Sequence, residues 1–306
     1  MRALITGASG FAGTALVRHL AAVGDDVIGW SRSSGDPDIT DRAAVFDAIA
    51  SANPDVIYHL AAQSHVPTSW EDPVTTLRVN VEGTQNLLDA AGAMSHARIV
   101  VVTSAEVYGA VTSDQLPITE DAPLRPSNPY ASSKAAADSL ALGAHLGTGL
   151  DVIRIRAFNH FGPGQATSFV SSGFAHRIAS AAAEGKTTID VGNLDVRRDF
   201  CDVRDVVRAY RLAATEGAGG EVYNVCSGTD RSIRELATAF VARSGSPVAL
   251  NSNPDLERPV DTPVVRGSAA RLFEHTGWVP EVPFETSVDD IYADAVNRLK
   301  DGVQAP

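Results

Sequence analysis

A glycine-rich turn stands between a strand pattern and a helical pattern at the start of the chain, and it constrains the fold more than any other feature. The strand pattern covers 3–6, the turn reads TGASGFAG, and the helical pattern covers 11–23. Glycines spaced GxxGxxG allow a tight turn, a close approach of the backbone to a pyrophosphate, and close packing of helix on strand. The helix N-terminus adds N–H donors and the positive end of a dipole. Such a turn can be purely structural, but this position favours a dinucleotide site. The residues of the predicted site are Gly7, Ser9, Gly10, Phe11 and Gly13.

Apolar runs and helical patterns alternate through the first half of the chain. Strands that are apolar throughout, separated by helices, indicate a parallel sheet covered on both faces. The sequence therefore predicts an α/β fold of the Rossmann type, with a doubly wound parallel sheet. The strands are expected at 3–6, 26–30, 56–60, 98–103 and 152–156, and the helices at 11–23, 43–51, 75–93 and 130–146.

The pattern changes after about residue 159. A Gly-Pro-Gly sequence, a stretch rich in Ser and Phe, and the Pro-rich segment 253–263 indicate loops and small elements instead of a second doubly wound sheet. A further apolar run at 221–225 is expected to return to the first sheet. We therefore expect two interleaved domains. They are a dinucleotide-binding domain of 1–158 plus 200–227 and a smaller C-terminal α/β substrate-binding domain of 159–199 plus 228–306.

Composition narrows the functional classes. The chain has 306 residues, a net charge of −12 and two cysteines. The negative charge argues against nucleic acid and anionic membranes as partners, and two cysteines cannot build a disulfide framework. No apolar run reaches the ~18 residues of a membrane helix, and the strand at the N-terminus leaves no room for a signal peptide, so a cytoplasmic location is expected. The spacing of His65 and His160 offers no metal-binding trio.

The end of the second predicted strand chooses between NAD and NADP. An acidic residue there would hold the ribose 2′-hydroxyl, whereas an arginine would accept a 2′-phosphate. Strand 26–30 ends in Ser31-Arg32, and its two aspartates lie at the other end. Arg32 therefore favours NADP(H), with a solvated surface arginine as the alternative. The other expected cofactor contacts are Asp38 and Ile39 at the adenine edge and Leu60, Ala61 and Ala62 along the cofactor backbone.

Tyr130 and Lys134 lie four residues apart in a predicted helix, which places both side chains on one face. A phenol has a pKa of about 10, too high for ready proton exchange at neutral pH, and a nearby ammonium lowers that pKa. The same spacing also occurs by chance on surface helices. Ser104 follows the fourth predicted strand, at the edge where ligands meet a doubly wound sheet. The three residues together predict acid–base chemistry beside the cofactor.

Several motifs resemble the extended short-chain dehydrogenase/reductases that act on nucleotide sugars. They are TGASGFAG, HLAAQSHV, VNVEGTQNLLDAA, TSAEVYG, PYASSK and RDFCDVRDVVRAY, and together they cover nearly the whole length. The resemblance implies that Ser104, Tyr130 and Lys134 are the catalytic triad, that Lys134 also holds the nicotinamide ribose, and that hydride moves between nicotinamide and sugar C4. It also implies a homodimer in which helices 75–93 and 130–146 form a four-helix bundle with their counterparts.

Three later segments narrow the resemblance. AFNHFGPGQ, GNLDVRRDF and RPVDTPVVRG are most similar to enzymes of GDP-mannose metabolism, and most of all to GDP-4-keto-6-deoxy-D-mannose reductases. The resemblance implies NADPH-dependent reduction of the C4 ketone of a GDP-linked sugar. The product would be GDP-D-rhamnose or its C4 epimer, and Tyr130 would donate the proton.

Redox-neutral nucleotide-sugar 4,6-dehydratases and 4-epimerases are the alternative. The dehydratases that the chain resembles carry a Glu preceded by a hydroxyl residue, or an Asp-Glu pair, in the turn that reads SAEVYG here. This chain has Glu106 preceded by Ala105. An alanine can neither give nor take a proton, which disfavours elimination, while Glu106 remains capable of base chemistry. A third interpretation, a non-catalytic NADP-binding regulator, is disfavoured by the intact Ser104, Tyr130 and Lys134.

A nucleotide sugar needs cations for its diphosphate, and arginine binds phosphates with two parallel hydrogen bonds. The resemblance places Arg198 and Arg258 near the diphosphate or ribose, and Asn159 near a phosphate or the sugar. Gln165 would lie in the next substrate loop and Val191 near the base. For the arginines, a salt bridge between the domains is the alternative. The substrate-binding residues expected are Ser104, Glu106, Asn159, Gln165, Val191, Arg198 and Arg258.

Overall fold

The structure is a computed structural model that describes residues 1–94, 96–256 and 262–301. Within this part of the chain, the main sheet is parallel and has the strand order β2-β1-β3-β4-β5-β9. This is the doubly wound Rossmann sheet that the alternating pattern predicts, so the expected fold class is confirmed. The strands are β1 (Arg2–Thr6), β2 (Asp26–Trp30), β3 (Val56–His59), β4 (Arg98–Ser104), β5 (Val152–Ala157) and β9 (Val222–Val225).

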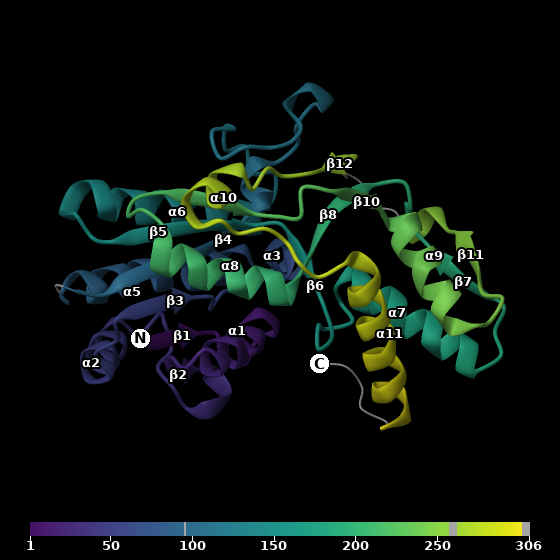
Figure 1. Cartoon of the computed structure of the whole chain (residues 1–306), viewed down its shortest axis with the longest axis horizontal. Helices are drawn as coiled ribbons and strands as arrows, with labels where there is room; N and C mark the ends of the chain where they lie inside the picture. Colours follow the sequence, from purple (N-terminus) through teal and green to yellow (C-terminus); the bar gives the residue numbers. More distant parts are fainter. Residues whose placement is uncertain (95, 257–261, 302–306) are drawn as a thin grey trace.

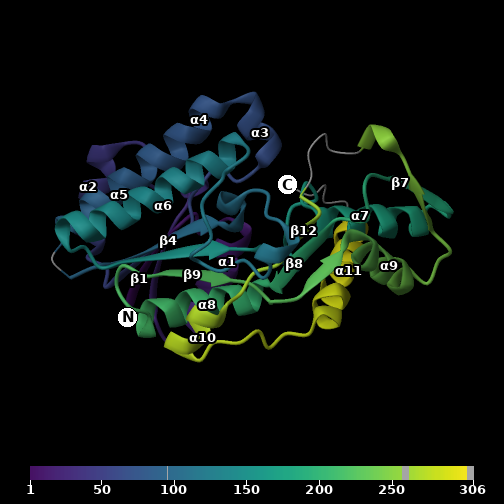
Figure 2. The same ribbon diagram turned by 90° about the horizontal axis from the view of Figure 1, so that it is seen from above.

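Helices cover both faces of the main sheet, as the two views show (Figures 1 and 2). Because side chains alternate along a strand, Ile5 of β1 packs in one apolar cluster with Leu16 of α1 and Val206 of α8. Its neighbour Leu4 packs in the opposite cluster with Ile49 of α2. The covering helices are α1 (Phe11–Ala22) and α8 (Val203–Glu216) on one face, and α2 (Arg42–Ala52), α5 (Gly83–Gly92) and α6 (Pro129–Thr148) on the other.

A second, smaller unit lies beside the carboxyl edge of the main sheet (Figure 1). Its small sheet has the order β10-β8-β12, and β6 also pairs with β8, while β7 pairs with β11. One apolar cluster packs three helices of this unit against one another, and it includes Phe174, Phe240 and Val288. The elements are β6 (Asn159–Phe161), α7 (Val170–Ala183), β7 (Thr188–Val191), β8 (Arg197–Asp202), β10 (Asp230–Ser232), α9 (Ile233–Ser244), β11 (Ala249–Ser252), β12 (Val264–Val265) and α11 (Phe284–Lys300).

The chain passes between the two units more than once. After β8 it returns to the main sheet as α8 and β9, as expected for the run at 221–225. The boundary expected at residue 200 falls inside β8. Helix α10 (Ala270–Thr276) packs against α8 and β9, with Leu272 and Trp278 in the core of the first unit. The expected domain limits stay a prediction. Strand β8 spans one of them, and α10, which was expected in the substrate-binding domain, packs on the dinucleotide-binding domain.

The helix expected at 75–93 is not continuous. The segment consists of α4 (Pro73–Leu77), a π-helical turn η2 (Arg78–Glu82) and α5, and the short α3 (Val66–Glu71) precedes it. A π turn inserts an extra residue, and such turns often occur at functional sites. Here Asn80 is 1% exposed and its amide bonds Gln63 and Ser133. The remaining short helices are η1 (Arg32–Ser34), η3 (Ala105–Tyr108), η4 (Ser113–Gln115) and η5 (Pro254–Leu256).

Among the helices that the structure describes, none combines the length and the apolar character needed to cross a membrane.

Candidate active site

The glycine turn packs so closely on itself and on the loop after β3 that a side chain is excluded at Gly7 and at Gly13. Gly7 has a φ of +74°, and a Cβ on it would lie 2.8 Å from the Ala61 nitrogen. A Cβ on Gly13 would lie 2.1 Å from the Gly7 carbonyl oxygen. Among the described residues, no side chain caps α1 at Gly10, so its first N–H groups remain available to an anion. The turn fits the pyrophosphate of a dinucleotide.

A buried polar chain, which the sequence did not reveal, holds the loop after β3 against β1. The Thr6 hydroxyl accepts the Ala61 N–H at 3.2 Å and bonds His59 Nδ1 at 2.8 Å. On its other side, His59 Nε2 bonds the Thr84 hydroxyl at 3.0 Å. Burial, helped by the charge of Lys134, lowers the pKa of His59 to about 3, so the ring is neutral. The half-buried residues of the loop are Leu60, Ala61 and Ala62.

Arg32 lies directly after β2, where the sequence predicts contact with a 2′-phosphate. Its side chain is 84% exposed, and Nη2 lies 4.0 Å from the Asp38 carboxylate. An exposed pair at this distance is weak, so the guanidinium can turn to a ligand. Hydrogen bonds from the backbone and side chain of Thr40 hold the pKa of Asp38 below its usual range. The Ile39 side chain packs against Gly83 in the core, whereas the Asp38 carboxylate lies near Arg32.

Tyr130 and Lys134 are brought together at the start of α6. Asn128 caps this helix, because its Oδ1 accepts the Ala131 N–H at 2.7 Å. Tyr130 is 9% exposed and Lys134 7% exposed. Lys134 Nζ donates to a backbone carbonyl of β4, that of Val102, at 2.9 Å. An Asn-Pro pair before a helical pattern is a capping signal, so the role of Asn128 could have been predicted.

Ser104 and Glu106 face this pair from the turn η3 at the end of β4. The Ser104 hydroxyl lies close enough to the phenol of Tyr130 to lower its pKa, and it accepts the Glu106 N–H at 3.2 Å. Glu106 is exposed, and its Oε2 accepts a hydrogen bond from the Asn128 amide at 3.2 Å. Between them, Ala105 is 9% exposed. The bond between Glu106 and Asn128 therefore connects η3 to the residue that caps α6.

Burial sets the protonation of the pair. It raises the pKa of Tyr130 to about 12, against the opposing effect of Ser104, and the Glu106 charge raises it further. It lowers the pKa of Lys134 to about 8. The expected lowering of the phenol pKa by the ammonium does not contribute here, and the net shift is upward. At neutral pH the phenol is protonated and the ammonium is charged, which suits Tyr130 as a proton donor.

The predicted substrate residues of the small unit differ in burial. Asn159, at the start of β6, is exposed. Gln165 is 5% exposed, and its amide is bonded at both ends, to the His160 carbonyl at 3.1 Å and the Ser171 hydroxyl at 2.7 Å. Val191 is 1% exposed and belongs to the core of the unit. In this structure Gln165 and Val191 brace the fold, and Asn159 is the one of the three that reaches solvent.

The arginines of β8 also differ. Arg197 forms ion pairs with Asp230 and, at 3.2 Å, with Glu235. Arg198 Nη1 donates to the carbonyl of Arg197 at 2.9 Å and to that of Thr262 at 2.8 Å. The ion pairs of Arg197 lie within the small unit and are not the salt bridge between the domains that was the alternative. The remaining predicted substrate residue, Arg258, lies outside the described residues.

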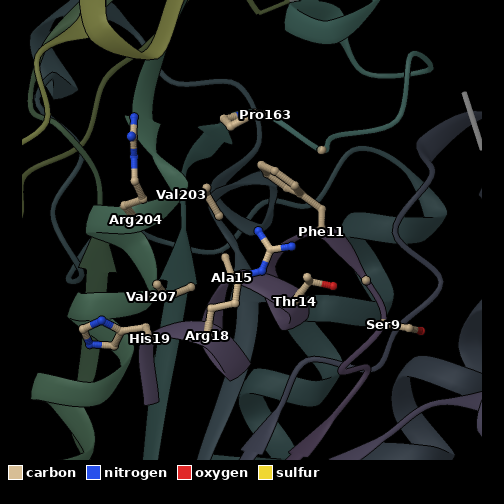
Figure 3. A pocket seen from close by; sticks show the side chains of 12 residues that line it. Ser9, Phe11, Thr14, Ala15, Arg18, His19, Pro163, Val203, Arg204 and Val207 are labelled. Atoms are coloured by element: carbon tan, nitrogen blue, oxygen red, sulfur yellow. The ribbon is translucent and has the colours of Figure 1, made fainter. Parts of the chain in front are cut away.

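A cavity of about 470 Å³ flanks the glycine turn, between α1, the start of α8 and the loop at 163–164 (Figure 3). Phe11 forms part of its wall and stacks on His160, with the ring centroids 5.8 Å apart. Arg18 extends into the cavity toward Phe11 (Figure 3). Because Tyr130 and Lys134 do not line this cavity, it adjoins the cofactor turn without containing the reacting groups. A metal-binding group of three or more side chains is not found in the described part of the chain.

Comparison with known proteins shows the family to which the chain belongs. The chain belongs to the NAD dependent epimerase/dehydratase family, whose model matches residues 3–226. The resemblance to extended short-chain dehydrogenase/reductases that act on nucleotide sugars is thereby confirmed. These enzymes bind a nicotinamide dinucleotide, which agrees with the glycine turn described above.

The relatives include both reductases and redox-neutral enzymes. GDP-6-deoxy-D-mannose reductase of Pseudomonas aeruginosa is 38% identical, over 98% of this chain and 99% of its own length. A solved structure described as RMD from Pseudomonas aeruginosa complexed with NADPH has a TM-score of 0.88 at 38% identity and covers 97% of this chain and 100% of its own. UDP-glucose 4-epimerase of Mycolicibacterium smegmatis is 35% identical, over 92% of this chain and 94% of its own length.

Proposed function

We propose that this chain is an NADPH-dependent reductase of the C4 ketone of GDP-4-keto-6-deoxy-D-mannose, with GDP-D-rhamnose or its C4 epimer as the product. The observation that carries the proposal is a buried phenol that stays protonated near Ser104, at the same edge of the main sheet as the glycine turn. Ketone reduction needs a proton donor at this position. Similarity to a GDP-6-deoxy-D-mannose reductase along almost the whole chain supports the same substrate.

The residues divide the work as follows. A bound NADPH supplies the hydride, which forms the new C–H bond at sugar C4. Ser104 and Tyr130 bind the carbonyl oxygen, and the phenol passes its proton to that oxygen as the C=O double bond becomes a C–OH single bond. The Lys134 ammonium stabilises the phenolate left behind and offers N–H donors to the cofactor ribose.

The cofactor would be held by the residues that fit it in this structure. The glycine turn and the N-terminus of α1 would bind the pyrophosphate, and Arg32 the 2′-phosphate. The small unit would contribute Arg198, Asn159 and the Arg258 segment to the nucleotide sugar, while Glu106 would contact the sugar.

The redox-neutral enzymes would use the same Ser104, Tyr130 and Lys134, but their reactions have further requirements. A 4,6-dehydratase also needs an acid for the departing C6 hydroxyl, and Ala105 cannot supply one beside Glu106. A 4-epimerase begins by oxidising the sugar, for which Tyr130 must first lose its proton. A phenol whose pKa is raised to about 12 rests in the protonated form at neutral pH, which is the form that carbonyl reduction uses.

The direct test mixes purified protein with GDP-4-keto-6-deoxy-D-mannose and NADPH and follows absorbance of the reduced nicotinamide. We expect NADPH loss matched by formation of a GDP-6-deoxyhexose, and the product identifies the face of C4 that receives hydride. An unchanged NADPH signal would contradict the proposal. GDP-mannose with NADP is then the substrate that tests the dehydratase alternative.

We also propose that the protein is a homodimer in the cytoplasm. A groove of about 1270 Å³ runs over α5 and α6, and part of its lining is small residues, including Gly92, Ala93, Gly143 and Ala144. Small residues let helices of two copies approach closely, as in a four-helix bundle. Light scattering after gel filtration should give twice the chain mass, and Ala144→Arg should give the chain mass; a wild-type monomer would contradict the dimer.

The proposed location in the cytoplasm is supported by the two buried free cysteines, which suit a reducing compartment.

A further inference from the structure

A buried charge lies one helical turn beyond Lys134 and takes no part in the chemistry above. Asp138 follows Lys134 by four residues, so Tyr130, Lys134 and Asp138 follow one another along one face of α6. Asp138 is 2% exposed. A carboxylate at such a place is tolerated only with partners of excellent geometry, because its desolvation is costly.

The charged partners of Asp138 are two arginines on β5, and the Thr103 hydroxyl of β4 also donates to Oδ2 at 3.5 Å. Oδ1 accepts from Arg154 Nη1 at 2.9 Å and from Arg156 Nη2 at 3.0 Å, and Oδ2 accepts from Arg156 Nε at 2.9 Å. Both arginines are buried, at 7% and 4% exposure, and they stand two apart on the strand, on the same face. The two parallel bonds between Asp138 and Arg156 fix orientation as well as distance.

Arg156 continues the connection to the turn that carries Ser104. Its Nη1 donates to the Tyr108 hydroxyl at 3.0 Å and to the Glu120 carbonyl oxygen at 3.0 Å. Tyr108 is fully buried at the end of η3, and its hydroxyl donates to Asn224 Oδ1 at 2.7 Å. One unbroken series of buried hydrogen bonds therefore runs from α6 through β5 to η3.

Apart from Asp138, Arg154 contacts a different part of the molecule. Its Nη2 donates to the Gly220 carbonyl at 3.1 Å, in the loop before β9 and away from η3. Two arginines of equal burial thus share one carboxylate, but Arg156 alone of the two reaches the turn of Ser104. This difference separates a role in the site from a role in general stability.

We propose that Asp138 and Arg156 are positioning residues that hold α6 and η3 in the register at which the Tyr130 and Ser104 hydroxyls meet the same carbonyl oxygen. The inference rests on the proposed carbonyl reduction. Neither residue touches the substrate; both act through the elements that carry the catalytic side chains. A misplacement of about 1 Å between reacting groups costs on the order of a hundredfold in rate.

The test compares Arg156→Met with Arg154→Met, which each remove one guanidinium from Asp138 and add the same side chain. We expect kcat to fall about a hundredfold for Arg156→Met and less than fivefold for Arg154→Met. The KM for the keto sugar and the Kd for NADPH should stay within about threefold, because binding does not need the transition-state register. Equal losses of kcat in the two variants would mean a structural role and would overturn the proposal.

Tyr108→Phe provides a variant that keeps the buried ring and removes only the hydroxyl that joins Arg156 to Asn224. We expect kcat to fall about tenfold and the urea midpoint to fall as well, because Arg156 and Asn224 each lose a buried partner, while unfolding stays cooperative. Amide hydrogen exchange offers a readout that needs no turnover: exchange in η3 and the first turn of α6 should quicken in Arg156→Met and not in Arg154→Met. Unchanged exchange in both variants would contradict the positioning role.

The two proposals fail in different ways. Wild-type protein that oxidises no NADPH with the keto sugar contradicts the proposed reaction, and the exchange pattern still decides the register. Wild-type turnover with equal kcat in Arg156→Met, Arg154→Met and Tyr108→Phe leaves the reductase intact and overturns the positioning role.

Discussion

The two sides of the candidate site are built from different kinds of structure. On the side of the main sheet, the site consists of strand ends, one glycine turn and the start of α6, each fixed by backbone pairing or by buried polar bonds. On the side of the small unit, it consists of short paired strands and loops, where a side-chain contact such as Arg198 to the Thr262 carbonyl ties a loop to β8.

This difference in construction predicts a difference in function. Groups fixed by a rigid sheet and helix can meet a reacting carbonyl with the precision that catalysis needs. Loops and short strands adapt to the shape of a nucleotide sugar and act on its affinity. Substitutions on the first side should therefore change kcat or cofactor binding, whereas substitutions on the second should change KM.

Tyr130→Phe should have the largest effect on the main-sheet side. Removing one hydroxyl deletes the proton donor while the buried ring stays in place, so we expect turnover to fall about a thousandfold. NADPH binding, measured by nicotinamide fluorescence, should stay within about threefold. Near-normal turnover would show that Tyr130 is not the donor, and a role for the protein that survives this variant would favour the non-catalytic interpretation.

The same comparison explains what the sequence could predict. The glycine turn, the strand ends and the Tyr–Lys pair are local patterns, and each maps directly onto the main sheet, where parallel pairing brings distant strand ends to one edge. The burial of Gln165 and Val191 depends on α7, β11 and α11, which are brought together by tertiary packing that no local spacing encodes. Asp138 carries a usable signal, since it repeats the spacing of Tyr130 and Lys134, but its partners on β5 appear only in the fold.

Substituting Lys134 measures how much the buried ammonium lowers the free energy of unfolding. Burial lowers the pKa of Lys134 to about 8 in the folded protein, below the ~10.4 of an exposed lysine. Between these values the unfolded chain binds more protons, so this residue's contribution to stability rises with pH. Lys134→Met should therefore be more stable than wild type by up to about 3 kcal/mol at pH 7, with the advantage shrinking toward pH 10.

Urea unfolding of both proteins at pH 7 and pH 10 measures that advantage. Other titrating groups cancel in the difference between the two proteins. An advantage that grows with pH, or that is absent at pH 7, would contradict the burial of a charged Lys134 at this position.

Gly13→Ala tests the cofactor turn. A Cβ there would lie 2.1 Å from the Gly7 carbonyl, so the turn must shift. We expect NADPH to bind at least roughly tenfold more weakly, with a loss of about 1–3 kcal/mol in the free energy of unfolding. Gly147→Ala, on α6, is the matched control, because a Cβ there meets nothing within 4 Å. Similar results for the two variants, by thermal shift and fluorescence titration, would show that the close packing is unimportant.

Arg32→Ala should change cofactor preference more than overall activity. The exposed guanidinium is free to swing from Asp38 to a 2′-phosphate. We expect the Kd for NADPH to rise about tenfold and the Kd for NADH to stay unchanged, because NADH lacks that phosphate. Asp38→Ala is the companion variant, since it removes the carboxylate that pairs with Arg32. Tighter binding of NADPH alone would mean that Asp38 competes with the 2′-phosphate, and weaker binding of both cofactors would support its predicted contact at the adenine edge. An equal change for the two cofactors would return Arg32 to the solvated-surface interpretation.

Arg198 and Arg197 give the smallest and sharpest contrast, on the side of the small unit. The two side chains are neighbours on β8, and Arg197 is already committed to Asp230 and Glu235. If Arg198 binds the diphosphate, Arg198→Ala should raise the KM for the keto sugar about fivefold to tenfold and leave kcat within about twofold. Arg197→Ala should leave KM unchanged and lower the unfolding temperature instead. A fall in kcat without a change in KM for Arg198→Ala would mean that this side also fixes the reacting groups, and the functional division between the two sides would fail.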